Sequence, residues 1–368
     1  MSRPLFLGLL LILALLLLQT APLRPAAAQA SAGLEKVNCH KGESINKALT
    51  KQPGAVNLVV EIDGLCHENV VVTRDRVTLR GDDPEEDGIQ AVANVEQTDA
   101  AVWVRGAQLV TVENLKLTGG FTGLTATDAN LPFLRMLNCR VEGNAQFGIQ
   151  LELSLLTAED TTIGPNTRFN VGAFAGSRFE CRNCTITNPP ASTVLDNVVV
   201  STGSQLFLFN STLTNGSINA SNASVIVTDS SLEAFAAPGA SSVIANTSSN
   251  VNLTRTQVEG PMRFTQGTTA QLFGVTQTPG STPGPAPNFA DDASYVKIGN
   301  AFPAVPAPGP PPIASNVLGF GLTNFSNLSL LQTSQVTGNF SCSLGANAVC
   351  PVLANVSGTS NCGLCPKP

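Results

Sequence analysis

Five side chains of the kinds that recognise sugars are distributed over three successive stretches of this chain: Trp103, Arg105, Asp128, Gln150 and Glu152. The face of an aromatic ring can stack on a pyranose, and polar groups beside it can bond the hydroxyls. Trp103, Arg105, Gln150 and Glu152 are therefore candidate ligand-binding residues. Hydrolysis of a glycosidic bond needs two carboxyls that face the same bond, so Asp128 and Glu152, with Arg105 beside them, are the candidate catalytic residues. Either site requires a fold that brings the three stretches onto one surface.

The composition narrows the class of protein. The chain has 368 residues, of which 43% are hydrophobic, 12% charged and 5% aromatic. Lys and Arg number 20 against 26 Asp and Glu, so there is no basic excess of the kind that attracts nucleic acid. Only two histidines occur, which argues against a His-rich site, and we predict no bound metal. The low charge, together with 32 Gly and 24 Pro, favours a turn-rich, all-β protein.

A repeat runs through the middle of the chain. Similar stretches read VTVENLKLTGG (110–120), LRMLNCRVEGN (134–144) and LTAEDTTIGPN (156–166), and further copies start at residues 179, 206, 225 and 251. Their mean period is about 23 residues, which is typical of solenoid coils. The eighth position of each copy is aliphatic, and this column comprises Leu117, Val141, Ile163, Ile186, Leu213, Leu232 and Val258. Alternation of apolar and polar residues within each copy indicates two short strands.

Turn-forming residues occupy fixed positions in the same repeat. The fifth position of each copy holds Asn114, Asn138, Asp160, Asn183, Asn210 and Asp229, with Arg255 in the last. Asn and Asp tolerate left-handed backbone conformations, which suits a bend between two strands. Small residues mark a second corner, at Ser154, Ser177, Ser204, Ala223, Ser249 and Thr268. Each period therefore predicts three short strands joined by turns.

The repeated columns point to a stack of coils, because a single coil cannot bury its apolar face. The pattern resembles the right-handed parallel β-helix family, the pectin-lyase-like fold, over residues 35–278. The resemblance implies a solenoid whose neighbouring coils lie about 4.8 Å apart, with the Asn side chains bonding one another along their column. At its N-terminal end, Ser44 precedes the apolar positions of residues 45–49 and predicts a short helix that caps the first coil.

The resemblance also bears on catalysis. It implies relatives such as pectate lyases, polygalacturonases, pectin methylesterases and uronan epimerases. The His-Gly and Arg-Ile-Lys segments of polygalacturonases do not occur in this sequence, and neither does an Asp-Pro-His-Asp segment like that of the epimerases. The sequence thus favours a protein without catalytic activity and without a cofactor. A divergent polysaccharide lyase or carbohydrate esterase stays open as an alternative, and calcium would be needed only by the lyase.

The chain contains nine cysteines, so at least one is unpaired within the chain. Cys39 and Cys66 flank the expected helix and are predicted to form a disulfide. Four more cysteines near the C-terminus are predicted to form two disulfides of open connectivity, with a zinc site as the less favoured alternative: Cys342, Cys350, Cys362 and Cys365. The remaining three, Cys139, Cys181 and Cys184, are expected to be small core residues rather than a redox site, with a Cys181–Cys184 disulfide as the alternative.

The order of segments predicts four regions. Residues 1–30 carry Arg3, an apolar run over 5–18 that is shorter than the roughly 20 residues of a membrane span, and an Ala28-Gln29-Ala30 cleavage site. They are expected to be a signal peptide, with an uncleaved anchor as the alternative. The solenoid and its N-terminal cap are expected over 31–278, a Pro-rich linker over 279–312 and a Cys-containing segment over 313–368.

These features together predict the function. We expect a secreted, non-catalytic protein of the cell envelope, wall or matrix, extracellular or periplasmic, that contacts polysaccharide and has no transmembrane segment after signal cleavage. The alternatives are a divergent lyase or esterase acting on polyuronate, and a purely structural surface adhesin. Asn-x-Ser/Thr triplets indicate either glycosylation or chance, at Asn183, Asn210, Asn215, Asn219, Asn222, Asn246, Asn252, Asn324, Asn327, Asn339 and Asn355.

Overall fold

The computed structural model describes residues 32–51, 56–96, 99–127, 132–189, 196–234, 240–279 and 288–299, and short strand segments between residues 316 and 357. The expected signal peptide, residues 1–30, lies outside the described residues. So do Cys350, Cys362 and Cys365. The disulfides expected from them and from Cys342, which ends the short strand β37 (Ser341–Cys342), therefore stay predictions.

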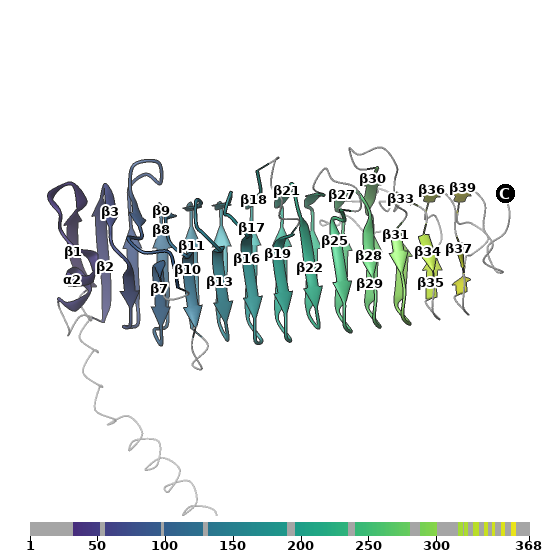
Figure 1. Cartoon of the computed structure of the whole chain (residues 1–368), viewed down its shortest axis with the longest axis horizontal. Coiled ribbons are helices and arrows are strands. Elements are labelled where there is room, and N and C mark those ends of the chain that lie inside the picture. The colour runs from purple at the N-terminus through teal and green to yellow at the C-terminus, as the bar shows by residue number, and fades with distance from the viewer. Residues whose placement is uncertain are drawn as a thin grey trace, which may run out of the picture.

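In the described residues, three parallel sheets run along a rod, and from β2 onward the chain passes through them in the repeating order A, B, C (Figure 1). Sheet A has 14 strands: β1 (Ala32–Asn38), β2 (Asn57–Asp63), β5 (Val77–Arg80), β8 (Val110–Glu113), β11 (Phe133–Leu137), β14 (Leu155–Glu159), β17 (Arg178–Arg182), β20 (Gln205–Phe209), β23 (Ser224–Thr228), β26 (Asn250–Thr254), β29 (Thr269–Phe273), β32 (Tyr295–Gly299), β35 (Asn327–Leu330) and β38 (Asn347–Val349).

Sheet B has 13 short strands: β3 (Leu65–His67), β6 (Gly88–Gln90), β9 (Lys116–Thr118), β12 (Arg140–Val141), β15 (Thr162–Ile163), β18 (Thr185–Thr187), β21 (Thr212–Thr214), β24 (Ser231–Glu233), β27 (Gln257–Glu259), β30 (Thr276–Thr278), β33 (Asn316–Leu318), β36 (Gln335–Thr337) and β39 (Asn355–Ser357). Sheet C has 12: β4 (Val70–Val72), β7 (Ala100–Arg105), β10 (Thr122–Thr127), β13 (Phe147–Glu152), β16 (Phe169–Phe174), β19 (Asp196–Ser201), β22 (Ser217–Ser221), β25 (Val243–Asn246), β28 (Met262–Phe264), β31 (Asn288–Ala290), β34 (Phe320–Leu322) and β37.

The predicted aliphatic column is confirmed by the strand register. Leu117 pairs with Val141 and Val141 with Ile163, and all three are fully buried. The second apolar column, through Val112 and Met136, stacks in the same way on sheet A. Because every inward side chain sits on its counterpart in the next coil, one continuous apolar core fills the rod.

The predicted Asn bends between sheets A and B are also confirmed. Asn114, Asn138 and Asn183 have φ of 52°, 46° and 55°, in the left-handed region. The Asn138 amide donates to Asn114 Oδ1 at 2.9 Å, and the Asn183 amide donates to Asp160 Oδ1 at 3.0 Å. Where the column ends in Arg255, the hydrogen bond becomes an ion pair with Asp229 at 2.6 Å.

A second amide ladder, which the repeat did not indicate, is buried between sheets B and C. Asn144 donates to Asn166 Oδ1 at 2.9 Å, and Asn166 donates to Asn170 Oδ1 at 2.8 Å. Asn170 in turn donates to Asn197 Oδ1 at 2.6 Å and to Asn188 Oδ1 at 2.9 Å. Coil length varies at this corner, so these asparagines do not recur at a constant spacing in the sequence.

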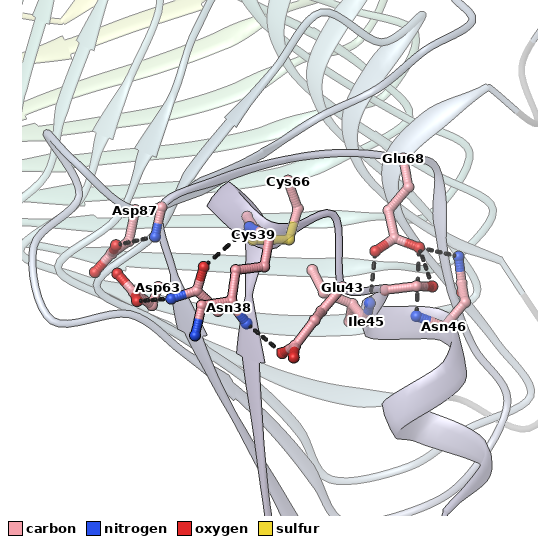
Figure 2. The surroundings of a disulfide bond; sticks show 12 residues. Asn38, Cys39, Glu43, Ile45, Asn46, Asp63, Cys66, Glu68 and Asp87 are labelled. Atoms are coloured by element: carbon pink, nitrogen blue, oxygen red, sulfur yellow. Dashed lines mark hydrogen bonds between the residues drawn. A yellow bond between two sulfur atoms is a disulfide. The ribbon is translucent and has the colours of Figure 1, made fainter.

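The N-terminal end of the rod carries the short helix α2 (Ile45–Thr50), with Ser44 as the residue that caps it. Ile45, Ala48 and Leu49 of the helix are buried. Figure 2 shows the Glu68 carboxylate facing the start of the helix, where it accepts from Ile45 N at 2.6 Å and from the Ser44 hydroxyl at 2.9 Å. Glu68 was not singled out in the sequence, because it lies far from the helix along the chain.

The Cys39–Cys66 disulfide is confirmed. Cys39 begins the single turn η2 (Cys39–Lys41), and Cys66 lies in β3 (Figure 2). The disulfide therefore ties this turn, which precedes α2, to the first coil. Nearby, Asn38 Nδ2 donates to Asp63 at 2.5 Å, and Asp87 accepts the amide of Gly64 at 2.7 Å.

The expectation that Cys181 and Cys184 are unpaired core residues is wrong, because the two form a disulfide across the bend after β17. The left-handed Asn183 between them turns the chain so that both sulfurs point inward, with Cα atoms 5.8 Å apart. Both residues are buried, as expected. Cys139 is the free cysteine of the described residues, and burial raises the pKa of its thiol to about 12.

The coils extend past the expected boundary at residue 278. Strand β31 pairs with β28, and β32 pairs with β29, although both lie in the range expected to be a Pro-rich linker. Val296 and Ile298 of β32 continue the apolar column of sheet A and are fully buried. In the sequence, the prolines of this range precede β31 or follow β32. In the part of the chain that the structure describes, there is no helix with the length and apolar character to cross a bilayer.

Candidate functional site

The outer face of sheet C brings together four of the five residues singled out in the sequence. Strands β7, β10 and β13 lie side by side, and their register places residues in two outward rows. The first row is Trp103, Thr125 and Gln150, and the second is Arg105, Thr127 and Glu152. The alternate residues of the same strands point into the core, because side chains of a strand alternate between its two faces.

Side-chain contacts tie the two rows to each other. The indole N–H of Trp103 donates to Thr127 Oγ1 at 3.2 Å, and the Arg105 guanidinium lies 5.3 Å from the centre of the Trp103 ring. Gln150 Nε2 donates to Glu152 Oε1 at 3.0 Å. These contacts orient a half-buried indole ring beside the Arg105 guanidinium, with the Glu152 carboxylate two coils away in the second row.

Two buried oxygens in the first row lack hydrogen-bond partners among the described residues. They are Thr125 Oγ1 and Gln150 Oε1, in residues that are 1% and 5% exposed. An unpaired buried polar atom costs about 1–3 kcal/mol, so such atoms are uncommon in a folded protein. Both oxygens are shielded from solvent, so a ligand hydroxyl would bond them only after the side chains above them move.

A cluster of phenylalanines lies beside these rows, on β13 and β16. The Phe147 ring stacks on Phe169 at 5.2 Å between centres and meets Phe174 edge-on at 5.9 Å. Gly172 lies under two of them, where a Cβ atom would come within 2.6 Å of the Phe174 ring. Sequence reasoning missed this cluster, although Phe174 stands in the same row as Glu152 in the next coil.

The candidate catalytic set is not assembled by the described residues. Asp128 lies outside them. Arg105 and Glu152 are separated by the intervening strand β10, which sets their backbones about 10 Å apart. Within the described part of the two rows, Glu152 is the one carboxylate. The described residues also contain no group of three His, Cys, Asp or Glu that could hold a metal ion.

Other charged clusters on the rod are internally paired. Lys116 and Arg140 of sheet B both contact Glu142, at 2.6 and 2.9 Å. Burial by itself would raise the pKa of Glu142, but the hydrogen bonds from these two cations outweigh it and the pKa is lowered. Such pairs hold adjacent coils together and offer no free nucleophile or base.

Comparison with solved structures identifies the fold. The structure of the C387A mutant of DFA-IIIase from Arthrobacter chlorophenolicus A6, in complex with DFA-III, superposes with a TM-score of 0.51 at 10% sequence identity, over 87% of this chain and 86% of that one. This chain is a right-handed parallel β-helix. The likeness establishes the fold and assigns no activity, because the identity is too low to transfer a site.

Two other solved structures are similar at a lower level. One is the enzymatically active domain of bacteriophage CBA120 tailspike protein 2, with a TM-score of 0.45 at 10% identity over 88% of this chain and 51% of that one. The other is the A-module of a mannuronan C-5 epimerase from Azotobacter vinelandii, with a TM-score of 0.38 at 12% identity over 90% and 100% of the two chains. No family model and no curated protein matches this β-helix.

Proposed function

We propose that this protein is a secreted, non-catalytic polysaccharide-binding rod whose contact surface is the outer face of sheet C around Trp103. The observation that carries the proposal is the outward row formed by Trp103, Thr125 and Gln150 on three successive coils. Thr125 and Gln150 each hold a buried oxygen that has no hydrogen-bond partner among the described residues. A sugar ring stacked on the indole would place its hydroxyls near the Arg105 guanidinium, and it would reach the shielded oxygens of Thr125 and Gln150 only by displacing the side chains above them.

The spacing of the coils suits an extended polymer. Trp103 and Phe174 stand on β7 and β16, three coils apart, which corresponds to about 14 Å along the rod. A chain lying along the rod axis would contact an aromatic ring at each end of this interval and the polar side chains between them. The charges of Arg105 and Glu152 balance each other, so the surface does not favour a strongly charged ligand.

The absence of catalysis is inferred from the same rows. A pair of carboxyls about 5–9.5 Å apart is needed to cleave a glycosidic bond, and the described part of these rows supplies only Glu152. Secretion is proposed from residues 1–30, and would be tested by finding a mature N-terminus near Ser31 after expression with the native leader.

Affinity gel electrophoresis tests the binding proposal. The protein would be run through gels containing a uronan, a glucan or a soluble chitin derivative, together with Trp103→Ala and with Phe133→Ala as a matched control. Phe133 is an exposed aromatic on sheet A, 44% exposed, so its removal should leave the mobility unchanged. We expect retardation of the native protein on at least one of the neutral polymers, the glucan or the chitin derivative, and its loss in Trp103→Ala. No retardation on any polymer would contradict the proposal and favour a purely structural adhesin.

The enzyme alternative needs a separate measurement. Polyuronates would be incubated with the protein, with and without calcium, and the products analysed for cleavage, unsaturated ends and released ester groups. We expect no product. Turnover by the native protein that is lost in Glu152→Gln would replace the non-catalytic proposal by a divergent lyase or esterase.

A further inference from the structure

The outer face of sheet A carries a row of aromatic and uncharged side chains on a different side of the rod from Trp103. Phe209 pairs with Thr228, Thr228 with Thr254, and Thr254 with Phe273. These four residues, here called the Phe209–Phe273 row, occupy four consecutive coils from β20 to β29. Two phenylalanines thus stand about 14 Å apart along the rod, with two threonines between them.

Two arginines mark the N-terminal end of this row, on β17. The Arg182 guanidinium lies 4.8 Å from the centre of the Phe209 ring, and Arg178 lies 4.2 Å from that of Phe207. Both arginines donate through Nη2 to the carboxylate of Glu180, which stands between them on the same strand. Each guanidinium therefore lies over a ring and is fixed at one nitrogen by Glu180.

These arginines remain available to a ligand. Their side chains are 44% and 50% exposed, whereas that of Glu180 is 10% exposed beneath them. A guanidinium has five N–H donors, and among the described residues each arginine uses one nitrogen to bond Glu180. Burial by itself would raise the pKa of Glu180, but the hydrogen bonds from Arg178 and Arg182 outweigh it and lower the pKa. The carboxylate thus stays ionised and keeps both arginines in place.

The strands that follow β17 on this face carry almost no charged side chains. The outward residues of β20, β23, β26, β29 and β32 include no carboxylate. The cation among them is Lys297, whose ammonium lies 5.9 Å from the Phe273 ring, at the far end of the row. Cations stacked on aromatic rings therefore stand at both ends of a neutral strip, on a chain whose overall charge is −6.

We propose that the Phe209–Phe273 row is a second binding surface, and that its ligand is an acidic glycan whose carboxylates pair with Arg178 and Arg182 at one end and with Lys297 at the other. The planar fork of arginine matches a carboxylate, and fixing it on a ring lowers the entropy lost on binding. The neutral strip would carry the sugar rings without repelling their charges. The proposal goes beyond the sheet C surface, because it uses another face of the rod and selects ligands by charge.

The test compares one polymer in two charge states. Polygalacturonate and its methyl-esterified form would be used as probes in affinity gels, with native protein and the double variant Arg182→Gln/Phe209→Ala. We expect the native protein to bind the acid form more tightly than the ester, and the double variant to lose about tenfold in affinity for the acid form. Added salt should weaken the native binding, because surface charge pairs are screened.

Matched controls separate the two surfaces. The double variant Arg135→Gln/Phe133→Ala removes an arginine and a phenylalanine from β11 of the same sheet. It is matched because Arg135, like Arg182, pairs with a glutamate: its guanidinium lies 3.1 Å from the carboxylate of Glu159. This control and Trp103→Ala should both leave the binding of polygalacturonate unchanged, and melting temperatures would verify that all variants are folded. Equal binding of acid and ester forms, or no effect of Arg182→Gln/Phe209→Ala, would overturn the inference. If Trp103→Ala alone abolished binding, the sheet C proposal would stand and this one would fall.

Discussion

The corners of the rod and its outer faces use the same strands in different ways. Asn170 and Phe174 lie on the one strand β16, yet Asn170 is fully buried in a ladder that links several coils, whereas Phe174 faces outward beside Glu152. A corner residue must bond the coil on each side of it, so Asn, Ser and Thr recur there. An outward residue has no such constraint. Outward side chains that differ from those of neighbouring coils, such as Trp103 and Arg182, are therefore where binding specificity is expected.

The largest expected effect lies in the buried ladder. In Asn170→Ala, the backbone and side-chain amides of Asn166 each lose a shared acceptor, and Asn197, Asn188 and the Thr187 carbonyl lose a donor. Because unpaired buried groups cost about 1–3 kcal/mol each, we expect the free energy of unfolding to fall by about 4 kcal/mol, measured by chemical denaturation. The matched control is Asn252→Ala on an outer face, which should change it by about 0.5 kcal/mol or less. Equal effects at the two sites would break the distinction between corner and face.

The two disulfides should differ because they close loops of different length. Cys39 and Cys66 are 27 residues apart, and Cys181 and Cys184 only 3. The chain-entropy model gives losses of about 3.5 kcal/mol for Cys39→Ser/Cys66→Ser and about 2 kcal/mol for Cys181→Ser/Cys184→Ser. Thermal unfolding of both variants checks this order. A larger loss for the short loop would mean that its sulfurs stabilise the corner mainly by packing.

Thr125→Val should stabilise the fold while weakening polysaccharide binding. It replaces a buried hydroxyl that has no described partner by a methyl group of similar size. We expect a gain of about 1 kcal/mol in the free energy of unfolding together with reduced retardation in affinity gels. The control is Thr157→Val, at a part-buried outward position of β14 on sheet A, which should leave binding unchanged. A destabilised Thr125→Val would show that the hydroxyl already has a partner.

The smallest expected effect is a pH dependence on sheet A. The folded-state pKa of Glu180 is lowered below its usual value of 4.5, so its ion pairs stabilise the fold above about pH 4.5 and lose this contribution as the pH falls through the lowered pKa. Glu180→Gln should therefore reduce the melting temperature at pH 7, by the equivalent of about 1 kcal/mol or less. The melting curves of the two proteins should converge toward pH 3. A constant difference from pH 7 to pH 3 would contradict the assignment.

Part of the candidate site could be predicted from the sequence because it depends on register. Trp103 and Arg105 precede the repeat copy at residue 110 by seven and five residues, and Gln150 and Glu152 precede the copy at residue 156 by six and four. Coils of similar length therefore place all four on one face. The unpaired oxygens of Thr125 and Gln150 could not be predicted, since whether a polar atom has a partner depends on all the side chains around it. The stacking of Arg178 and Arg182 on Phe207 and Phe209 likewise depends on side-chain conformations across two coils.

The sequence by itself determined the coil, its apolar columns and the bends at Asn114, Asn138 and Asn183, because local backbone preference and side-chain alternation act between residues close together in the chain. Only the tertiary structure decided that Cys181 bonds Cys184, that Glu68 caps α2, that the Asn166–Asn170 ladder closes a second corner and that β31 and β32 extend the rod. These contacts join different coils or depend on how a bend aims its side chains. Since the connections between strands vary in length, the spacing of residues in the sequence does not specify them.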